Sequence, residues 1–243
     1  SLSLDADLYH DICDAAVRIA RSSGYYNAGT VEFLVDCTGD FYFLEVNPRL
    51  QVEHPVTEWR LGLDLVGLQI KVAANQPLPI RQVDLKPRGH VIEARVYAED
   101  PTNGYLPGAG ILRRFQPPDS PWIRNDVGVY EGGEVSVHYD SLLGKLVIFG
   151  ADRSEAIARL TQALSQYVVQ GIPTNIALLR SIVTDDDFIS GNFDIDFVRR
   201  RIEPLFCEDV ELPIEALMSA IAQELLTSGC AYGYRLPSYD TDS

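Results

Sequence analysis

Two segments rich in β-forming residues flank a short turn sequence and predict a β-hairpin near the start of the chain. The first segment covers residues 30–36 and the second covers residues 41–47. Glycine and aspartate in the intervening residues 37–40 suit a tight turn. A four-residue loop would pair Asp36 with Phe41, and this pairing fixes the register of everything behind it.

That register brings two carboxylates face to face across the hairpin. Glu32 would lie directly opposite Glu45, and Thr30 would lie opposite Asn47. Like charges that face each other across a strand pair are destabilising, unless a cation lies between them. Carboxylate and amide oxygens are the ligands that Mg²⁺ prefers. The pattern therefore fits a metal site, and it fits equally well two exposed glutamates on a solvated sheet face.

Polar residues continue at every second position beyond the hairpin. They are Glu45, Asn47, Arg49, Gln51 and Glu53. An extended chain sends successive side chains to opposite faces, so all five would share one side. Together they offer ligands for a cation and a guanidinium for an anion, a mixture that a solvated edge strand rarely gathers.

The sequence of residues 45–58, E-V-N-P-R-L-Q-V-E-H-P-V-T-E, resembles the catalytic segment of biotin carboxylase, the ATP-dependent component of biotin-dependent carboxylases. ATP-grasp ligases share the Glu-x-Asn-x-Arg part, and the Gln-x-Glu-His continuation points to biotin carboxylase. Further matching segments follow in the family's order: Arg88-Gly89-His90, Glu93-Ala94-Arg95, Ala98-Glu99-Asp100-Pro101, His138-Tyr139-Asp140-Ser141, Gly144-Lys145-Leu146 and Gly171-Ile172-Pro173-Thr174-Asn175. A lone motif is weak evidence, but a collinear set over residues 5–198 is strong.

The resemblance implies an α+β fold. The C-terminal part of an ATP-grasp domain would occupy residues 1–80, the β-rich biotin carboxylase C-terminal domain residues 81–198, and a helical tail or linker residues 199–243. A complete member of the family begins with a nucleotide-fold domain and carries a glycine-rich lid, and we find neither segment in the sequence. The chain resembles the C-terminal half of such an enzyme, so we expect it to be inactive in isolation.

The resemblance also implies a metal site on the hairpin. Glu32, Glu45 and Asn47 would hold the Mg²⁺ or Mn²⁺ ions that bridge the ATP phosphates, because metal ions neutralise the charge that develops in phosphoryl transfer. In the same reading Glu32 and Glu45 bind ATP through the metal. His138 and Lys145, which lie in other matching segments, are interpreted as structural.

Further roles follow for the bicarbonate and biotin sites. Arg49 would bind bicarbonate with its planar guanidinium, and Gln51 and the backbone of Val52 would complete the pocket. Glu53 would be the general base that accepts the bicarbonate proton, and Arg124 would bind biotin and stabilise its enolate. From the residues alone, Glu53 is more readily a structural carboxylate paired with Arg49 than a base, and Arg124 is a surface arginine.

Composition limits the partners. A net charge of −15 argues against nucleic acid and anionic membranes. The four cysteines lack zinc-site spacing and indicate reduced thiols. No apolar run is long enough to span a membrane, and no signal peptide is visible. These features favour a cytoplasmic protein, or one of the mitochondrial matrix if a targeting segment is missing.

The family's partners are ATP, bicarbonate, a biotinylated carrier domain, a carboxyltransferase and a second copy in a homodimer. The sequence contains no Ala-Met-Lys-Met acceptor motif, so biotin would be carried on another domain or chain. Two other functions stay open, namely another ATP-grasp ligase and a non-catalytic assembly module. The Gln-x-Glu-His segment and the β-rich region over residues 88–150 argue against the first of these. The final carboxyl acceptor leaves no trace in the sequence.

Hydrophobic periodicity predicts the remaining elements. Helices are expected over residues 5–22, 63–74 and 213–227, after Thr174, and after a capping box that begins at Asp152. Strands are expected from residue 88 to residue 97 and over residues 111–116, 121–125, 134–138 and 142–149.

Overall fold

The computed structural model describes residues 4–36, 38–206, 214, 218–219 and 221–223. The chain divides into two compact units between Glu203 and Pro204. The helix predicted over residues 213–227 lies for most of its length outside the described residues. No described helix combines the length and the apolar character that crossing a membrane requires.

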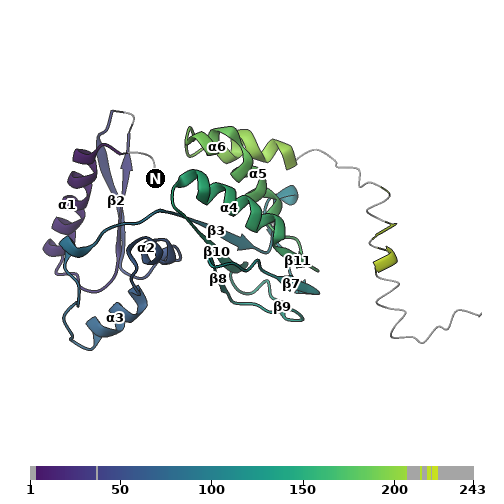
Figure 1. Cartoon of the computed structure of the whole chain (residues 1–243), viewed down its shortest axis with the longest axis horizontal. Helices are drawn as coiled ribbons and strands as arrows, with labels where there is room; N and C mark the ends of the chain where they lie inside the picture. The colour runs from purple at the N-terminus through teal and green to yellow at the C-terminus, as the bar shows by residue number, and fades with distance from the viewer. Residues whose placement is uncertain (1–3, 37, 207–213, 215–217, 220, 224–243) are drawn as a thin grey trace, which may run out of the picture. The chain divides into compact units, whose positions relative to one another are not determined.

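The first unit contains both helices and strands, and strands β3 to β10 follow one another without an intervening α-helix, which confirms the α+β class (Figure 1). The α-helices are α1 (Ala6–Ser22), α2 (His54–Leu61), α3 (Leu65–Ala73), α4 (Arg153–Gln166), α5 (Ile176–Thr184) and α6 (Asp186–Ser190). Shorter helical turns are η1 (Gln82–Asp84), η2 (Pro101–Asn103), η3 (Val198–Ile202) and η4 (Glu203–Phe206). The strands are β1 (Thr30–Val35), β2 (Phe41–Asn47), β3 (His90–Tyr97), β4 (Glu99–Asp100), β5 (Leu106–Pro107), β6 (Gly110–Ile111), β7 (Arg114–Gln116), β8 (Ile123–Val127), β9 (Glu134–Val135), β10 (Leu142–Gly150) and β11 (Val168–Gln170).

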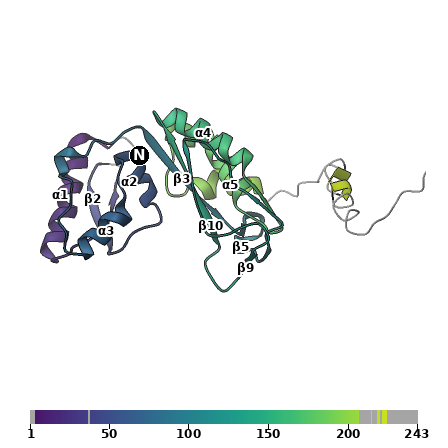
Figure 2. The same cartoon turned by 60° about the horizontal axis from the view of Figure 1, so that its bottom comes forward.

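A three-stranded antiparallel sheet, in the order β3-β10-β8, forms the centre of the region after residue 88. Helix α4 lies across one face of this sheet (Figure 2). The buried side chains between them include Val96, Leu146, Ile148, Leu160 and Leu164. The opposite face of β3 and β10 contacts helix α2. The alternation of polar and apolar residues in β3 therefore separates a hydrophobic core from a charged layer.

Helix α4 begins with the reciprocal contacts that its capping sequence predicts. The Asp152 side chain accepts a hydrogen bond from Glu155 N at 2.9 Å. Glu155 Oε2 in turn accepts one from Ala151 N at 2.6 Å, one residue earlier than in an ideal capping box. The strand predicted over residues 111–116 is instead two short strands, β6 and β7, and β9 stops at Val135.

The predicted hairpin is present, but its turn is longer than expected. Val35 pairs with Phe41, so the prediction that Asp36 pairs with Phe41 is wrong. A register shift between Glu32 and Phe33 then compensates for the extra turn residue. Beyond this bulge Glu32 lies opposite Glu45, as predicted, since a bulge inserts one residue into one strand of the pair.

The polar stripe does not continue as an extended strand, and that prediction is wrong. Strand β2 ends at Asn47, residues 48–53 form a turning loop, and α2 begins at His54. Pro55, at the start of α2, has the fixed φ that suits the first helical turn. Gly62 ends the helix in the left-handed conformation at φ 67°, and its N–H donates to Glu58 O at 2.7 Å.

Candidate active site

Glu32 and Glu45 converge on the amide of Asn47. Asn47 Nδ2 donates to Glu32 Oε1 at 2.7 Å and to Glu45 Oε1 at 3.0 Å. Gln51 Nε2 donates to the same Glu32 oxygen at 2.9 Å. The two carboxylates therefore share one small space, and the loop that follows β2 folds back onto it.

This cluster suits a divalent cation that retains other ligands. Among the residues that the structure describes, no three His, Cys, Asp or Glu side chains form a metal-binding group. The cluster offers two carboxylates and an amide, and the amide nitrogen lies between the carboxylates. Half a turn of the Asn47 amide would replace Nδ2 by Oδ1 and present three oxygens. Mg²⁺ usually keeps several waters and takes phosphate oxygens as ligands, so these few protein ligands suffice.

Arg49 stands in the loop with its guanidinium near backbone and amide oxygens. Nη1 lies 3.2 Å from Leu50 O, and Nη2 lies 3.4 Å from Asn47 Oδ1. Arg49 is exposed, and within the described part of the chain it forms an ion pair with neither Glu45 nor Glu53. The alternative that Glu53 is a structural partner of Arg49 is therefore wrong. The guanidinium retains donors for a small anion.

Glu53 pairs instead with Arg95 of β3. The Arg95 guanidinium also donates from Nη1 to Tyr97 Oη at 3.2 Å. The Glu93-Ala94-Arg95 segment matches the family, but the sequence alone indicates no role for Arg95. In β3, Arg95 alternates with the buried residues Ala94 and Val96, and the packing of α2 against β3 brings it to Glu53.

Arg124 of β8 is held on all three guanidinium nitrogens. Nε and Nη2 donate to the two oxygens of Asp126 at 2.8 and 2.9 Å, and Nη1 donates to Glu58 Oε2 at 2.6 Å. These hydrogen bonds, first that to Asp126, raise the pKa of Arg124 further above its usual range. Only 28% of the side chain is exposed, so the surface position expected from the residue alone is wrong. Arg124 connects β8 with α2.

Lys145 of β10 lies beside this pair. Its Nζ is 3.3 Å from Asp126 Oδ2 and donates to Val52 O at 3.0 Å. Burial by itself would raise the pKa of Asp126, but hydrogen bonds from Arg124 and Lys145 hold that pKa below its usual value. The backbone of Val52, predicted for the bicarbonate pocket, is thus tied to the sheet through its carbonyl.

Glu93 of β3 completes the charged layer. Both carboxylate oxygens are buried, and neither has a hydrogen-bond partner among the described residues. Burial raises the pKa of Glu93 to about 7, against the opposing charge of Lys145. With this raised pKa, Glu93 carries only part of a negative charge near neutral pH, and the cations Arg95, Arg124 and Lys145 pair with Glu53, Glu58 and Asp126.

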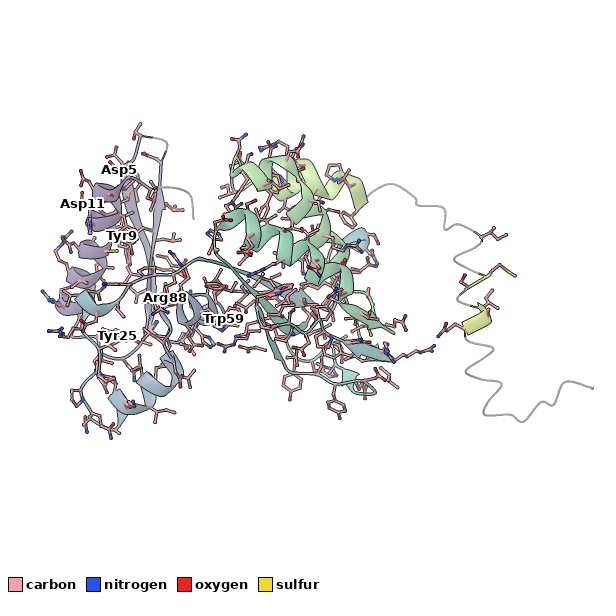
Figure 3. All side chains as sticks on the ribbon, in the orientation of Figure 1. Asp5, Tyr9, Asp11, Tyr25, Trp59 and Arg88 are labelled. Carbon is pink, nitrogen blue, oxygen red and sulfur yellow. The ribbon has the colours of Figure 1, made fainter. Side chains whose placement is uncertain are left out.

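An aromatic contact packs α2 onto the sheet. Trp59, labelled in Figure 3, projects from α2, and its ring lies edge-on to that of Phe149 in β10, with centroids 6.3 Å apart. In the last turn of α2, Arg60 O accepts a hydrogen bond from Arg88 N at 2.8 Å. These contacts fix α2 over the charged layer, and the loop of residues 48–53 leads directly into that helix.

The acidic hairpin, the loop that bears Arg49 and the β-rich region after residue 88 are the arrangement that the sequence resemblance predicts. Comparison with known proteins supports both parts. The family model for the carbamoyl-phosphate synthase L chain, ATP binding domain, matches residues 1–81. The model for the biotin carboxylase C-terminal domain matches residues 93–200. The chain belongs to the biotin carboxylase family.

Individual relatives agree with this membership. The chain is 47% identical over 197 residues to the mitochondrial methylcrotonoyl-CoA carboxylase subunit alpha of Arabidopsis thaliana, covering 80% of this chain and 27% of the relative. It is 46% identical over 200 residues to the human mitochondrial propionyl-CoA carboxylase alpha chain, covering 82% and 28%. The chain therefore spans less than a third of these relatives.

A solved structure shows the same fold. The biotin carboxylase domain dimer of 2-oxoglutarate carboxylase from Hydrogenobacter thermophilus, in complex with MgADP, ADP and bicarbonate, superimposes with a TM-score of 0.82 at 37% sequence identity. The match covers 87% of this chain and 46% of that chain. The architecture described above is thus that of slightly less than half of a biotin carboxylase domain.

Proposed function

We propose that the polypeptide to which this chain belongs carboxylates biotin at the expense of ATP, using bicarbonate that is activated as carboxyphosphate. The observation that carries the proposal is the contact between Gln51 and Glu32. It joins the carboxylate pair of the hairpin to the loop that bears Arg49. A site for a metal-bound nucleotide and a site for a small anion therefore adjoin, as phosphorylation of bicarbonate requires.

The chain's own residues divide into two groups of ligands. Glu32, Glu45 and Asn47 would hold Mg²⁺ or Mn²⁺, which neutralises charge on the ATP phosphates when bound. Arg49 would bind bicarbonate with its free donors, because a guanidinium matches two carboxylate-like oxygens. Gln51 and the backbone of Val52 would complete that pocket.

Glu53 would act as the base that takes the bicarbonate proton. Its carboxylate pairs with Arg95, which holds it at the end of the loop that bears Arg49. The resemblance assigns Arg124 to the biotin enolate, and this stays a prediction. The geometry favours Arg95 for that role, because Arg95 lies beside Glu53 whereas all three nitrogens of Arg124 are engaged with Asp126 and Glu58.

Partners and boundaries follow from the same proposal. Residues 1–80 would complete an ATP-grasp domain together with sequence outside this chain, residues 81–198 would form the C-terminal domain, and residues 199–243 a linker. A biotinylated carrier domain and a carboxyltransferase would act on the product, and two copies would form a dimer. We place the protein in the cytoplasm or, as the names of the plant and human relatives suggest, in mitochondria.

The test is ATP cleavage measured as ADP release by the full-length polypeptide, with bicarbonate and free biotin omitted in turn. We expect turnover to require bicarbonate and to increase with biotin. Cleavage that responds to ammonia or an amino acid instead would favour another ATP-grasp ligase. The isolated 243 residues should show little turnover, and robust turnover by them would contradict the proposed division of the site.

A further inference from the structure

We propose that Lys145 is a positioning residue for the bicarbonate loop, which comprises residues 48–53. The inference rests on the proposed function, because that function is what gives the loop its ligands. Lys145 lies in β10, outside both the hairpin and the loop that carry the proposed substrate ligands. It acts on the loop through one backbone carbonyl, that of Val52, at 3.0 Å from its Nζ.

The Lys145 ammonium has little freedom to lie elsewhere. Only 12% of its side chain is exposed, and a buried charge requires compensating partners. It has two oxygen partners, Val52 O at 3.0 Å and Asp126 Oδ2 at 3.3 Å. Asp126 is itself fixed by the two parallel hydrogen bonds from Arg124. Lys145 therefore connects a rigid part of the sheet to a loop outside it.

Two neighbouring cations of the sheet hold two consecutive residues of the loop. Arg95 lies directly opposite Lys145 in the β3–β10 pairing. Arg95 pairs with Glu53, and Lys145 binds the carbonyl of Val52. Val52 lies between Gln51 and Glu53 in the chain. The orientation of its backbone therefore influences the directions of the Gln51 and Glu53 side chains.

The loop has few other supports of its own. Its backbone contacts are short-range, from Arg49 N to Asn47 O at 2.9 Å and from His54 N to Gln51 O at 3.3 Å. Without Lys145 the Val52 carbonyl would lose its bond to the sheet. Displacement of a substrate ligand by about 1 Å can cost on the order of a hundredfold in rate. Bicarbonate, rather than ATP, is the substrate whose binding should weaken.

The experiment compares Lys145→Met with wild type in the full-length polypeptide. Steady-state ADP release gives KM for bicarbonate and KM for MgATP separately. We expect KM for bicarbonate to rise about tenfold, while KM for MgATP changes less than about twofold. The variant leaves Asp126 paired with Arg124, so the sheet keeps its ion pair. Asp126→Asn removes the charge that fixes Lys145 and should change the same constant in the same direction by a smaller factor, which covers the case in which Lys145→Met does not fold.

Arg159→Met is the matched control. Arg159 also bonds one carbonyl, Phe149 O at 2.7 Å, and one carboxylate, that of Glu155 at 2.7 Å, but it lies on α4 away from the loop. It should leave KM for bicarbonate unchanged. The positioning role would be overturned if Lys145→Met changed both KM values equally. It would also be overturned if Lys145→Met lowered only kcat and Arg159→Met lowered kcat to the same extent. Absence of bicarbonate-dependent turnover in wild type would instead refute the proposed function.

Discussion

The region before residue 88 and the region after it differ in how many hydrophobic side chains they bury. Among the described residues, every buried aliphatic or aromatic side chain except Ala15 and Pro55 lies beyond residue 90. The hairpin, by contrast, exposes large apolar side chains on β1 and β2, namely Leu34, Val35, Tyr42, Phe43, Leu44 and Val46. The predicted metal ligands all lie in the hairpin, while the core that stabilises the unit lies in the β3-β10-β8 sheet and α4.

The stable sheet and the proposed site are in contact at a few charged residues. Helix α2 and the bicarbonate loop are the parts of the first region that contact the sheet of the second, and Arg95, Lys145 and Arg124 hold them by charged contacts. The sheet thus supplies a rigid support for a loop that has little structure of its own. We expect changes in the core to alter stability, changes in the hairpin to alter activity, and changes in the charged layer to alter both.

The largest expected effect is the loss of a core leucine. Leu146 is fully buried in β10, so Leu146→Ala should lower the free energy of unfolding by about 3 kcal/mol. Leu44 is 52% exposed in the hairpin, and Leu44→Ala should change that free energy by no more than about 0.5 kcal/mol. Urea unfolding of the 243-residue chain measures both. Similar losses for the two variants would contradict the contrast between the regions.

Removal of a hairpin carboxylate should affect activity without affecting stability. Glu45→Gln keeps the shape of the side chain but removes a charge that would face the metal. We expect MgATP cleavage by the full-length polypeptide to fall about a hundredfold, with no change in Tm. Glu134→Gln, a change at an exposed strand carboxylate of β9, is the control. Unchanged cleavage by Glu45→Gln would refute the assignment of Glu45 to the metal.

The charged layer predicts a pH dependence of stability. The pKa of Glu93 is about 7 in the folded chain, above the ordinary value of 4.5. The folded state therefore binds the proton more tightly, so this group's contribution to stability is full below pH 4.5 and is lost as the pH rises through 7. Glu93→Gln should reduce the fall in unfolding free energy between pH 5 and pH 8 by roughly 2 kcal/mol. Parallel pH profiles for variant and wild type in urea unfolding would refute a buried, protonated Glu93.

The smallest expected effect separates two arginines of the sheet. Arg95→Met should slow the carboxylation of free biotin about tenfold more than it slows bicarbonate-dependent ATP cleavage. Arg124→Met should lower Tm and reduce both rates alike, because Arg124 connects β8 with α2. The two assays are run side by side on the full-length polypeptide. The reverse pattern would return the enolate role to Arg124.

The sequence predicted the hairpin and its facing carboxylates because local turn and strand signals determine them. It placed Glu32 opposite Glu45 correctly although the turn is one residue longer, since the bulge beside Phe33 restores the register. Neither the longer turn nor the bulge has a clear signal in the sequence. Agreement at the site thus arose from two deviations that cancel.

The loop and its supports were harder to predict. Alternation of polar residues past Asn47 suggested a strand, yet Pro55 and Gly62 were available signals for the start and end of a helix between them. The pairing of Glu53 with Arg95, and of Lys145 with Val52, depends on how α2 packs against the sheet. No local pattern encodes contacts between residues so far apart in the chain.

Binding of Mn²⁺ measures the convergence of Glu32 and Glu45 most directly. Electron paramagnetic resonance of free Mn²⁺, titrated with the full-length polypeptide in the presence of ADP, gives the affinity without any turnover. The convergent carboxylates predict that the double variant Glu32→Gln, Glu45→Gln binds Mn²⁺ at least about tenfold more weakly than wild type, with an unchanged Tm. Equal affinity in the two proteins would show that the hairpin does not hold the metal.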